Sequence, residues 1–402
     1  MYLDLARLRG SFPALDQGVA HFDGPGGSQV PRQVAQAVAA TLTSGISNRG
    51  AVTAAERHAD AVVAGARSAV ADLLGCRAGG VVFARSMTQA AYDLARALSK
   101  QWAEGDEIVV TRLDHDANIR PWTAAARAVG ATVRPAGFDR VTGTLRVDDI
   151  AAVLSPRTRV VAVTGASNLL GTRPDVAAIS EAAHAVGALV HVDGVHLTPH
   201  APVSLDELGA DFYTCSPYKF FGPHHGVLVG APELLERVHP DKLLPSSDAV
   251  PERFELGTLP YELLAGTTAA VDFIAGLSPS GPGPADRRAR VLASMRLVEA
   301  HEEELFARLL DGLGAISGVT LYGSAARRTP TALFTLAGRS PREVYERLAR
   351  VDVNAPAGTF YAIEAARWIG LGEDGAVRAG LAPYNNAEDV DRLLAGVKEL
   401  AR

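Results

Sequence analysis

The chain has 402 residues, of which 48% are hydrophobic, and it carries a formal net charge of −6 at pH 7. This length suffices for one large α/β domain with a smaller one, or for two domains. A negative net charge without a clustered basic stripe argues against nucleic-acid binding. The longest apolar runs are far shorter than a membrane span, and the N-terminus lacks the apolar stretch of a secretion signal. We therefore expect a soluble, cytoplasmic protein.

Strand-like and helix-like segments alternate from about Phe83 to Gly230, which is the pattern of a doubly wound, mostly parallel sheet. Apolar residues at helical spacing separate the short apolar runs that predict strands. Glycines at 105, 130 and 187 precede predicted strands, as short turns require. The predicted strands are 79–85, 107–112, 131–136, 159–168 and 189–193, and the predicted helices are 88–98, 121–129 and 174–186.

The clearest compositional break is 278–284 (SPSGPGP), which predicts a linker into a second domain. After it come a long helical pattern over 285–313, strands over 319–322 and 331–336, and amphipathic helices over 341–350 and 386–400. This order predicts a smaller α+β domain. We expect a large domain over 16–277 and a small domain formed by 1–15 together with 285–402.

One stretch, residues 188–230, combines an aspartate at a strand end, Asp193, with a lysine, Lys219. An aldehyde cofactor such as pyridoxal phosphate needs a primary amine to hold it and a carboxylate to keep its ring nitrogen protonated. Lysine is scarce here, with four among 39 basic residues, and Lys219 alone lies in an apolar, glycine-rich context. Lys219 and Asp193 are therefore candidates for these two tasks.

Nine segments spread over nearly the whole chain extend this hypothesis. They are HFDGPGGSQVP (21–31), SNRGAV (47–52), FARSMTQA (83–90), TRLDHDANIRPW (111–122), ASNLLGT (166–172), VDGVH (192–196), SPYKFFGP (216–223), FELGT (254–258) and VRAGLAPYN (377–385). In this order they resemble the class V aminotransferase family of fold-type I pyridoxal-phosphate enzymes, most closely its cysteine desulfurase branch. The resemblance implies an α/β transferase fold of type I, pyridoxal 5′-phosphate as cofactor and an amino acid as substrate.

The resemblance also implies roles around the cofactor ring. Lys219 would bind the cofactor covalently and move the Cα proton of the substrate, and Asp193 would pair with the ring nitrogen. His115 would stack on the ring. Asn168 would lie near the phenolic oxygen and the substrate carboxylate, and His196 stands where the desulfurases usually carry glutamine, facing that oxygen. The alternatives are a helix cap for Asp193 and a buried structural histidine for His115.

A phosphate group binds well at a helix N-terminus. The resemblance assigns this task to Met87 through its backbone amide and to Thr88 through its amide and hydroxyl. Ser216 and Tyr218 match positions that touch the phosphate in relatives, although Tyr218 replaces the usual histidine. Thr258 corresponds to a residue that relatives donate from the neighbouring subunit, which implies a homodimer with shared active sites.

Two arginines are candidates for the substrate carboxylate. Arg378 matches the family arginine that grips this group, a task suited to a planar bidentate donor. Without the motif, Arg378 would be read as one solvated arginine among many. Arg49 is a second carboxylate-binding or entrance residue.

The chain also departs from the desulfurases at the position of a catalytic thiol. In the desulfurases that this chain resembles, a mobile cysteine lies shortly before the VR motif. The matching segment here, 354–370, contains no cysteine. Of the two cysteines present, Cys76 precedes a predicted strand and Cys215 lies within one. Both are therefore interpreted as small core residues. Their number and spacing predict no disulfide framework and no metal site.

A persulfide-forming route is therefore not expected. The first interpretation is a C–S lyase that eliminates the β-substituent of cysteine or of a cysteine S-conjugate. The alternatives are an aminotransferase, epimerase or decarboxylase of another amino acid, or a desulfurase with a relocated thiol, because the fold does not choose among them. A cofactor-binding protein without catalysis is a further class, and the set Lys219, Asp193 and Arg378 argues against it.

Overall fold

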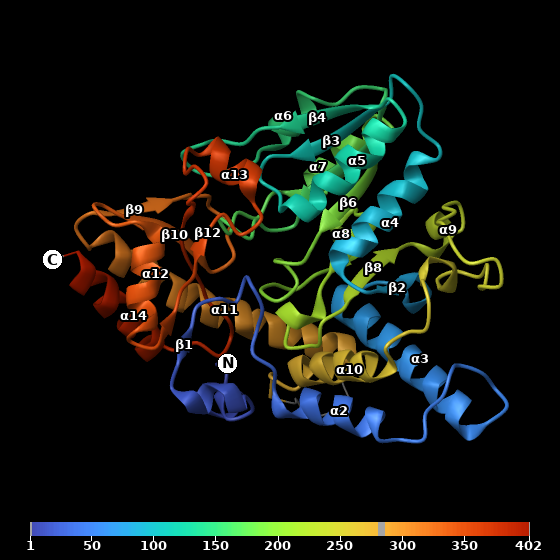
Figure 1. Cartoon of the computed structure of the whole chain (residues 1–402), viewed down its shortest axis with the longest axis horizontal. Helices are drawn as coiled ribbons and strands as arrows, with labels where there is room; N and C mark the ends of the chain where they lie inside the picture. The colour runs from blue at the N-terminus through green and yellow to red at the C-terminus, as the bar shows by residue number, and fades with distance from the viewer. Residues whose placement is uncertain (1, 280–285, 402) are drawn as a thin grey trace.

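The structure, a computed structural model, describes residues 2–279 and 286–401 (Figure 1). Most of the predicted linker 278–284 therefore lies outside the described residues. Within the described part of the chain, no helix has the length and apolar character that crossing a membrane requires.

A seven-stranded sheet forms the larger part of the molecule. In sheet order its strands are β2 (Val81–Ala84), β8 (Gly226–Gly230), β7 (Phe212–Cys215), β6 (Leu189–Asp193), β5 (Thr158–Thr164), β3 (Glu107–Thr111) and β4 (Thr132–Ala136). β8 runs antiparallel to both of its neighbours, and the other pairs are parallel. This mostly parallel α/β sheet confirms the predicted fold class.

Helices cover both faces of this sheet because alternate side chains of each strand point to opposite sides. Ile108 and Val110 pack with the helices of one face, and Val109 packs with those of the other. On the first face lie α4 (Met87–Ser99) and α5 (Arg120–Ala128), and on the second lie α3 (Ala54–Leu74), α7 (Val176–Ala185), α10 (Tyr261–Ala275) and part of α11 (Arg287–Gly314). Shorter or peripheral helices are α1 (Leu5–Arg9), α2 (Arg32–Leu42), α6 (Val147–Ala151), α8 (Leu205–Leu208) and α9 (Pro232–Leu235).

The C-terminal part builds a second core around a four-stranded antiparallel sheet. Its strands in order are β12 (Ala357–Gly358), β13 (Ala376–Gly380), β10 (Thr331–Leu336) and β9 (Val319–Tyr322), and its helices are α12 (Pro341–Ala349), α13 (Ile363–Trp368) and α14 (Ala387–Leu400). β1 (Ala20–His21) pairs in parallel with β11 (Val353–Asn354), so the chain near residue 20 joins this part. The division into 16–277 and 1–15 plus 285–402 stays a prediction.

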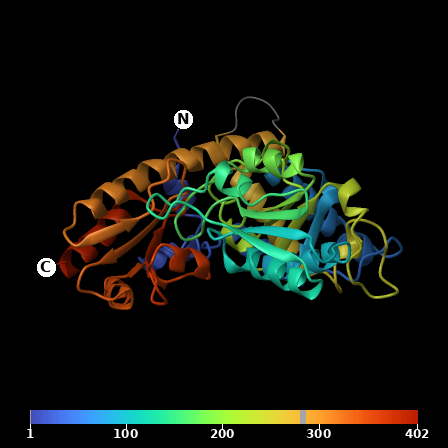
Figure 2. The ribbon, with the colours of Figure 1, turned by 90° about the horizontal axis from the view of Figure 1, so that it is seen from above.

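Helix α11 connects the two cores, and Figure 2 shows it running along both parts of the molecule. Its first half contributes Val291 and Val298 to the core of the large sheet. Its second half contributes Leu305 and Leu309 to the C-terminal core. One continuous helix therefore fixes how the two sheets lie relative to each other.

The predicted elements agree closely with the observed ones. Each predicted strand and helix has an observed counterpart, and their ends differ by a few residues, as expected where helix ends fray. The strands 319–322 and 331–336 are β9 and β10. The turn glycines Gly105, Gly130 and Gly187 have φ values of 90°, 74° and 82°, a left-handed conformation that glycine adopts without a Cβ clash.

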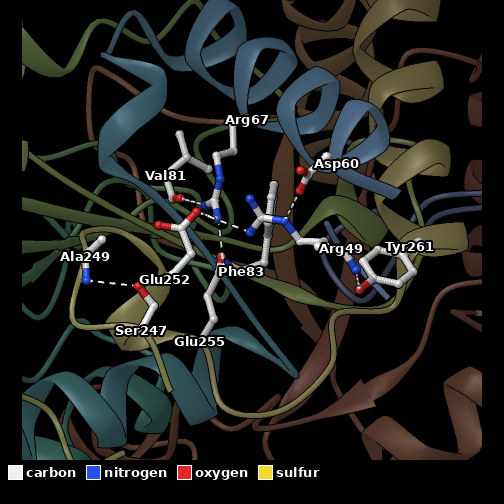
Figure 3. Close-up of polar contacts among 10 residues, drawn as sticks. All are labelled: Arg49, Asp60, Arg67, Val81, Phe83, Ser247, Ala249, Glu252, Glu255 and Tyr261. Carbon is white, nitrogen blue, oxygen red and sulfur yellow. Dashed lines mark hydrogen bonds and ion pairs between the residues drawn. The ribbon is translucent and has the colours of Figure 1, made fainter. Parts of the chain in front are cut away.

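Side chains close the free edge of the large sheet at β2 (Figure 3). Arg67 donates to the carbonyl of Val81, and the carboxylate of Glu255 accepts from the backbone N–H of Phe83 at 2.9 Å. Arg67 and Glu255 also pair with each other at 2.9 Å, and both side chains are buried. The pair therefore satisfies backbone groups that an edge strand would otherwise present to another chain.

Replacing Arg67 by methionine tests how much this buried pair stabilises the fold. The change leaves the Glu255 carboxylate buried without its partner, so we expect a loss of about 3 to 5 kcal/mol in the free energy of unfolding. Urea unfolding measures it. Arg77→Met at the exposed pair with Glu233 is the control, and its loss should be too small to measure because exposed ion pairs contribute little to stability. Equal losses in both variants would contradict the assigned role.

Candidate active site

The ends of neighbouring parallel strands bring the predicted residues together. Asp193 is the last residue of β6, and it lies in register with Thr164 of β5 and Thr214 of β7. Ser216 directly follows β7, and Lys219 ends the short turn after it. In open α/β sheets, ligands bind at these carboxyl ends, so the topology places a site here.

Two adjoining cavities lie at this place. The inner cavity has a volume of about 90 Å³ and the outer one about 670 Å³. Nine of the predicted site residues line the inner cavity: Met87, Thr88, His115, Asn168, Asp193, His196, Ser216, Tyr218 and Lys219. Arg378 lines the outer cavity, and Lys219 belongs to both. The lysine therefore lies where the two spaces meet.

The amine of Lys219 is held in a buried environment. Its Nζ donates to the carbonyl of Pro25 in the N-terminal loop. Burial, together with the nearby charge of Arg378, lowers the pKa of Lys219 to about 8. A much larger fraction of this amine is neutral near pH 7 than of an ordinary lysine, and the neutral form is the nucleophile.

Asp193 is a buried carboxylate facing the same cavity. Its Oδ1 accepts from the backbone N–H of Val195 at 3.0 Å. Burial raises the pKa of Asp193 to about 6, while that hydrogen bond and the charge of Lys219 act in the opposite direction. The group therefore remains ionised at neutral pH, and a cation placed beside it would be stabilised.

His115 is neutral and has a defined tautomer. Burial and the charges of Lys219 and Arg378 lower its pKa to about 4. Its Nδ1 accepts from the backbone N–H of Ala117 at 3.0 Å, so we assign the ring proton to Nε2. The ring therefore adds no positive charge to the cavity.

A buried polar network behind His115 was not found from the sequence. Asn118 donates to Asp114 at 2.6 Å and accepts from Trp122 Nε1 at 3.1 Å, and its Oδ1 lies 2.8 Å from Nδ1 of His191. All four side chains are buried. The network ties the loop of His115 to β6, the strand that carries Asp193. The LDHDAN motif contained Asp114 and Asn118, but its spacing did not indicate this partner strand.

Two further residues of the inner cavity each have a polar atom without a hydrogen-bond partner in the described structure. Nε2 of His196 lies 2.9 Å from the hydroxyl of Thr331 and 3.0 Å from that of Thr329, and its buried Nδ1 has no partner among the described residues. Asn168 donates through Nδ2 to the carbonyl of Phe360 at 2.9 Å, while its Oδ1 has no partner in the described chain. Such unsatisfied buried atoms are costly unless a ligand completes them.

The start of helix α4 forms the wall near Met87 and Thr88. Ser86 caps the helix by accepting from the N–H of Gln89 at 3.1 Å. A Cβ on Gly226 of β8 would lie 2.3 Å from the nitrogen of Met87, so this glycine allows the helix start to approach the sheet. The first N–H groups of a helix lack intrahelical partners and favour an anion, as the phosphate prediction requires.

Arg378 lies in β13 and reaches the outer cavity with a buried side chain. Its Nη2 donates to Asp23 at 2.8 Å and its Nη1 donates to the carbonyl of Asn168 at 3.1 Å. The ring of Phe360 covers the guanidinium, with its centroid 3.8 Å from Cζ. Asp23 and Phe360 belonged to segments noted in the sequence, but neither received this role there.

The structure does not bring Arg49 or Thr258 to the described cavities. Arg49 instead pairs with Asp60 at 2.6 Å and with Glu252 at 3.2 Å (Figure 3). Thr258 is exposed to solvent. Their predicted roles at an entrance and in a neighbouring subunit stay predictions.

Neither cysteine lies at the site. Cys215 is buried in β7 and Cys76 is partly buried, and the described cavity walls contain neither. Burial raises the pKa of Cys76 to about 12 and raises that of Cys215 strongly, so both thiols are poor nucleophiles. The wall of the outer cavity instead contains Phe360 and Tyr361, both with positive φ, from the segment 354–370, which contains no cysteine.

Comparison with known proteins agrees with this geometry. The sequence profile described as "Aminotransferase class-V" matches residues 20–393. An uncharacterized protein of Mycobacterium tuberculosis is 35% identical over 403 residues, with 100% of both chains covered. A cysteine desulfurase of Klebsiella pneumoniae is 32% identical over 428 residues, covering 100% of this chain and 99% of that protein.

A solved structure shows the same fold. The cysteine desulfurase CsdA of Escherichia coli superposes with a TM-score of 0.86 at 27% sequence identity, covering 99% of this chain and 98% of that one. The family match over most of the chain and the full-length relatives lead to one conclusion. The chain belongs to the class V aminotransferase family and is a pyridoxal-phosphate-dependent enzyme.

Proposed function

We propose that this protein is a C–S lyase that eliminates the β-substituent of cysteine or of a cysteine S-conjugate. The observation that carries the proposal is a complete set of groups for an amino-acid substrate in a cavity whose described walls contain no thiol. Elimination removes a proton from Cα and a thiolate from Cβ, and the resulting aminoacrylate hydrolyses to pyruvate and ammonia. No enzymic thiol takes part in these steps.

The residues present fit the cofactor. Lys219 would bind its aldehyde, Asp193 its ring nitrogen, and the N-terminus of α4 its phosphate. Asn168 Oδ1 and His196 Nδ1, which have no partner among the described residues, would offer polar contacts to the cofactor. When bound, pyridoxal phosphate supplies an electron sink for the pair of electrons left at Cα.

The side chains around the substrate then have separate tasks. Arg378 binds the α-carboxylate as a planar donor and fixes the orientation of Cα. The amine of Lys219 takes the proton from Cα, because its pKa of about 8 makes it a base suited to neutral pH. The neutral ring of His115 would stack on the cofactor without competing for that proton.

The volume of the outer cavity supports S-conjugates of cysteine, as well as cysteine itself, as substrates. The cavity measures about 670 Å³, more than cysteine fills, and Tyr92, Phe360 and Tyr361 lie in its wall. Aromatic rings bind apolar groups well. The proposal therefore includes S-conjugates with an apolar group beyond the sulfur.

A homodimer with shared sites is part of the proposal. Buried Glu255 anchors the loop before Thr258, while Leu256 at its tip is 56% exposed and Thr258 is exposed. A firmly anchored loop with an exposed apolar tip is suited to contact with a second copy. Thr258 would then reach the phosphate of the partner's cofactor.

Product analysis in a variant with Cys76→Ser and Cys215→Ser tests the elimination route. We expect pyruvate and ammonia from cysteine, with turnover within about twofold of the parent after correction for folded protein, because neither thiol reaches the site. Mass spectrometry should detect no persulfide on the parent enzyme. Alanine as the main product, lost in the variant, would establish desulfuration through an enzymic thiol and contradict the proposal.

The pKa of Lys219 predicts how cofactor capture depends on pH. Because burial lowers this pKa to about 8, half of the amine is neutral at about that pH and nearly all of it about one pH unit higher. The rate at which cofactor-free protein binds pyridoxal phosphate covalently, followed by absorbance, should rise with a midpoint near pH 8 and level off above about pH 9. A rise that continues to about pH 10, as for an ordinary lysine, would contradict the assignment.

A further inference from the structure

Asp23 and Arg378 form an ion pair in the wall of the outer cavity. The distance from Nη2 of Arg378 to Oδ1 of Asp23 is 2.8 Å, and both residues line that cavity with Lys219. The two residues lie 355 positions apart in the sequence. The pair therefore exists only because the N-terminal loop and β13 meet beside the site.

The N-terminal loop holds the carboxylate of Asp23 in a defined place. Asp23 forms a β-bridge with Gly380, and the N–H of Gly26 donates to the carbonyl of Asp23 at 2.8 Å. A Cβ on Gly26 would lie 2.5 Å from the Asp23 carboxylate. Glycine at 26 thus allows the turn to close directly over this carboxylate.

The two members of the pair differ in exposure. The side chain of Arg378 is 3% exposed and that of Asp23 is 36% exposed. Phe360 covers one face of the guanidinium, and Nη1 donates a hydrogen bond to the carbonyl of Asn168. Arg378 is therefore fixed in the wall, whereas Asp23 presents an anionic oxygen to the cavity.

The charges of this ion pair are complementary to those of an α-amino acid. Such a molecule carries a carboxylate and an ammonium on adjacent atoms, and the wall presents a cation and an anion in hydrogen-bond contact. We infer that Asp23 accepts a hydrogen bond from the substrate α-ammonium while Arg378 binds the α-carboxylate. The inference rests on the proposed function, because it assumes an amino-acid substrate at this site.

The position of Lys219 supports the orientation. Its Nζ contacts the carbonyl of Pro25, two residues after Asp23. An amino group held by Asp23 would thus arrive next to the amine that it must replace on the cofactor. Of the other charged groups in the outer wall, Asp116 pairs with Arg120 at 2.8 Å, so Asp23 is the carboxylate beside both Arg378 and Lys219 in the described structure.

The test compares ligands with and without the ammonium group on the holoenzyme. Alanine lacks a β leaving group, and propionate is alanine without its ammonium. We expect Asp23→Asn to weaken alanine binding roughly tenfold, the effect of losing a charge-assisted hydrogen bond. Propionate binding should stay unchanged or tighten, because a competing anion beside Arg378 has been removed. Isothermal titration measures alanine, and competition against alanine measures propionate.

Two comparisons separate this role from a structural one. Equal weakening of alanine and propionate would mean that Asp23 only orients Arg378, and unchanged alanine binding would mean that Asp23 does not contact the substrate. Either result overturns the inference. Glu364→Gln is the control, since Glu364 pairs with Arg120 at 2.8 Å but does not line the described cavity, and it should leave both affinities within about twofold. Because the test measures binding and not products, failure of the elimination proposal would leave its result interpretable.

Discussion

The site depends on placing two buried cations beside each other without an uncompensated charge. Lys219 and Arg378 line the same cavity, and the charge of Arg378 favours the neutral form of Lys219. Removing a cation from water costs several kcal/mol unless an anion accompanies it. Asp23 accompanies Arg378, and Asp193 lies close enough for its charge to act on Lys219. The charges in the cavity are therefore nearly balanced, and an added zwitterion, which has no net charge, preserves that balance.

Three parts of the chain supply these charges. Strand ends of the large sheet provide Asp193 and Lys219, the C-terminal sheet provides Arg378, and the N-terminal loop provides Asp23. The spacing between them is then a property of the whole fold, and α11 belongs to both cores that set it. A change in the packing of α11 would alter distances in the site without touching it.

Local patterns in the sequence predicted the strands and helices because periodicity and turn glycines are local signals. Asp193 and Lys219 could be placed for the same reason, since Asp193 ends β6 and Lys219 closely follows β7. The pairing of Asp23 with Arg378 could not be predicted from the sequence, because no local pattern joins residues so distant in the chain. The turn at Phe360 and Tyr361 was also beyond reach, since positive φ is expected of glycine or asparagine and not of two aromatic residues. The hydrogen bonds from Asn168 and from the N–H of Asp116 stabilise it.

We propose that Lys219 carries the cofactor in this buried setting. Borohydride reduction of the purified holoenzyme, followed by digestion and mass spectrometry of the peptides, identifies the residue that carries it. We expect one cofactor-derived mass addition, on the peptide that contains Lys219. An addition on Lys100, Lys242 or Lys398, or no addition after incubation with pyridoxal phosphate, would contradict it.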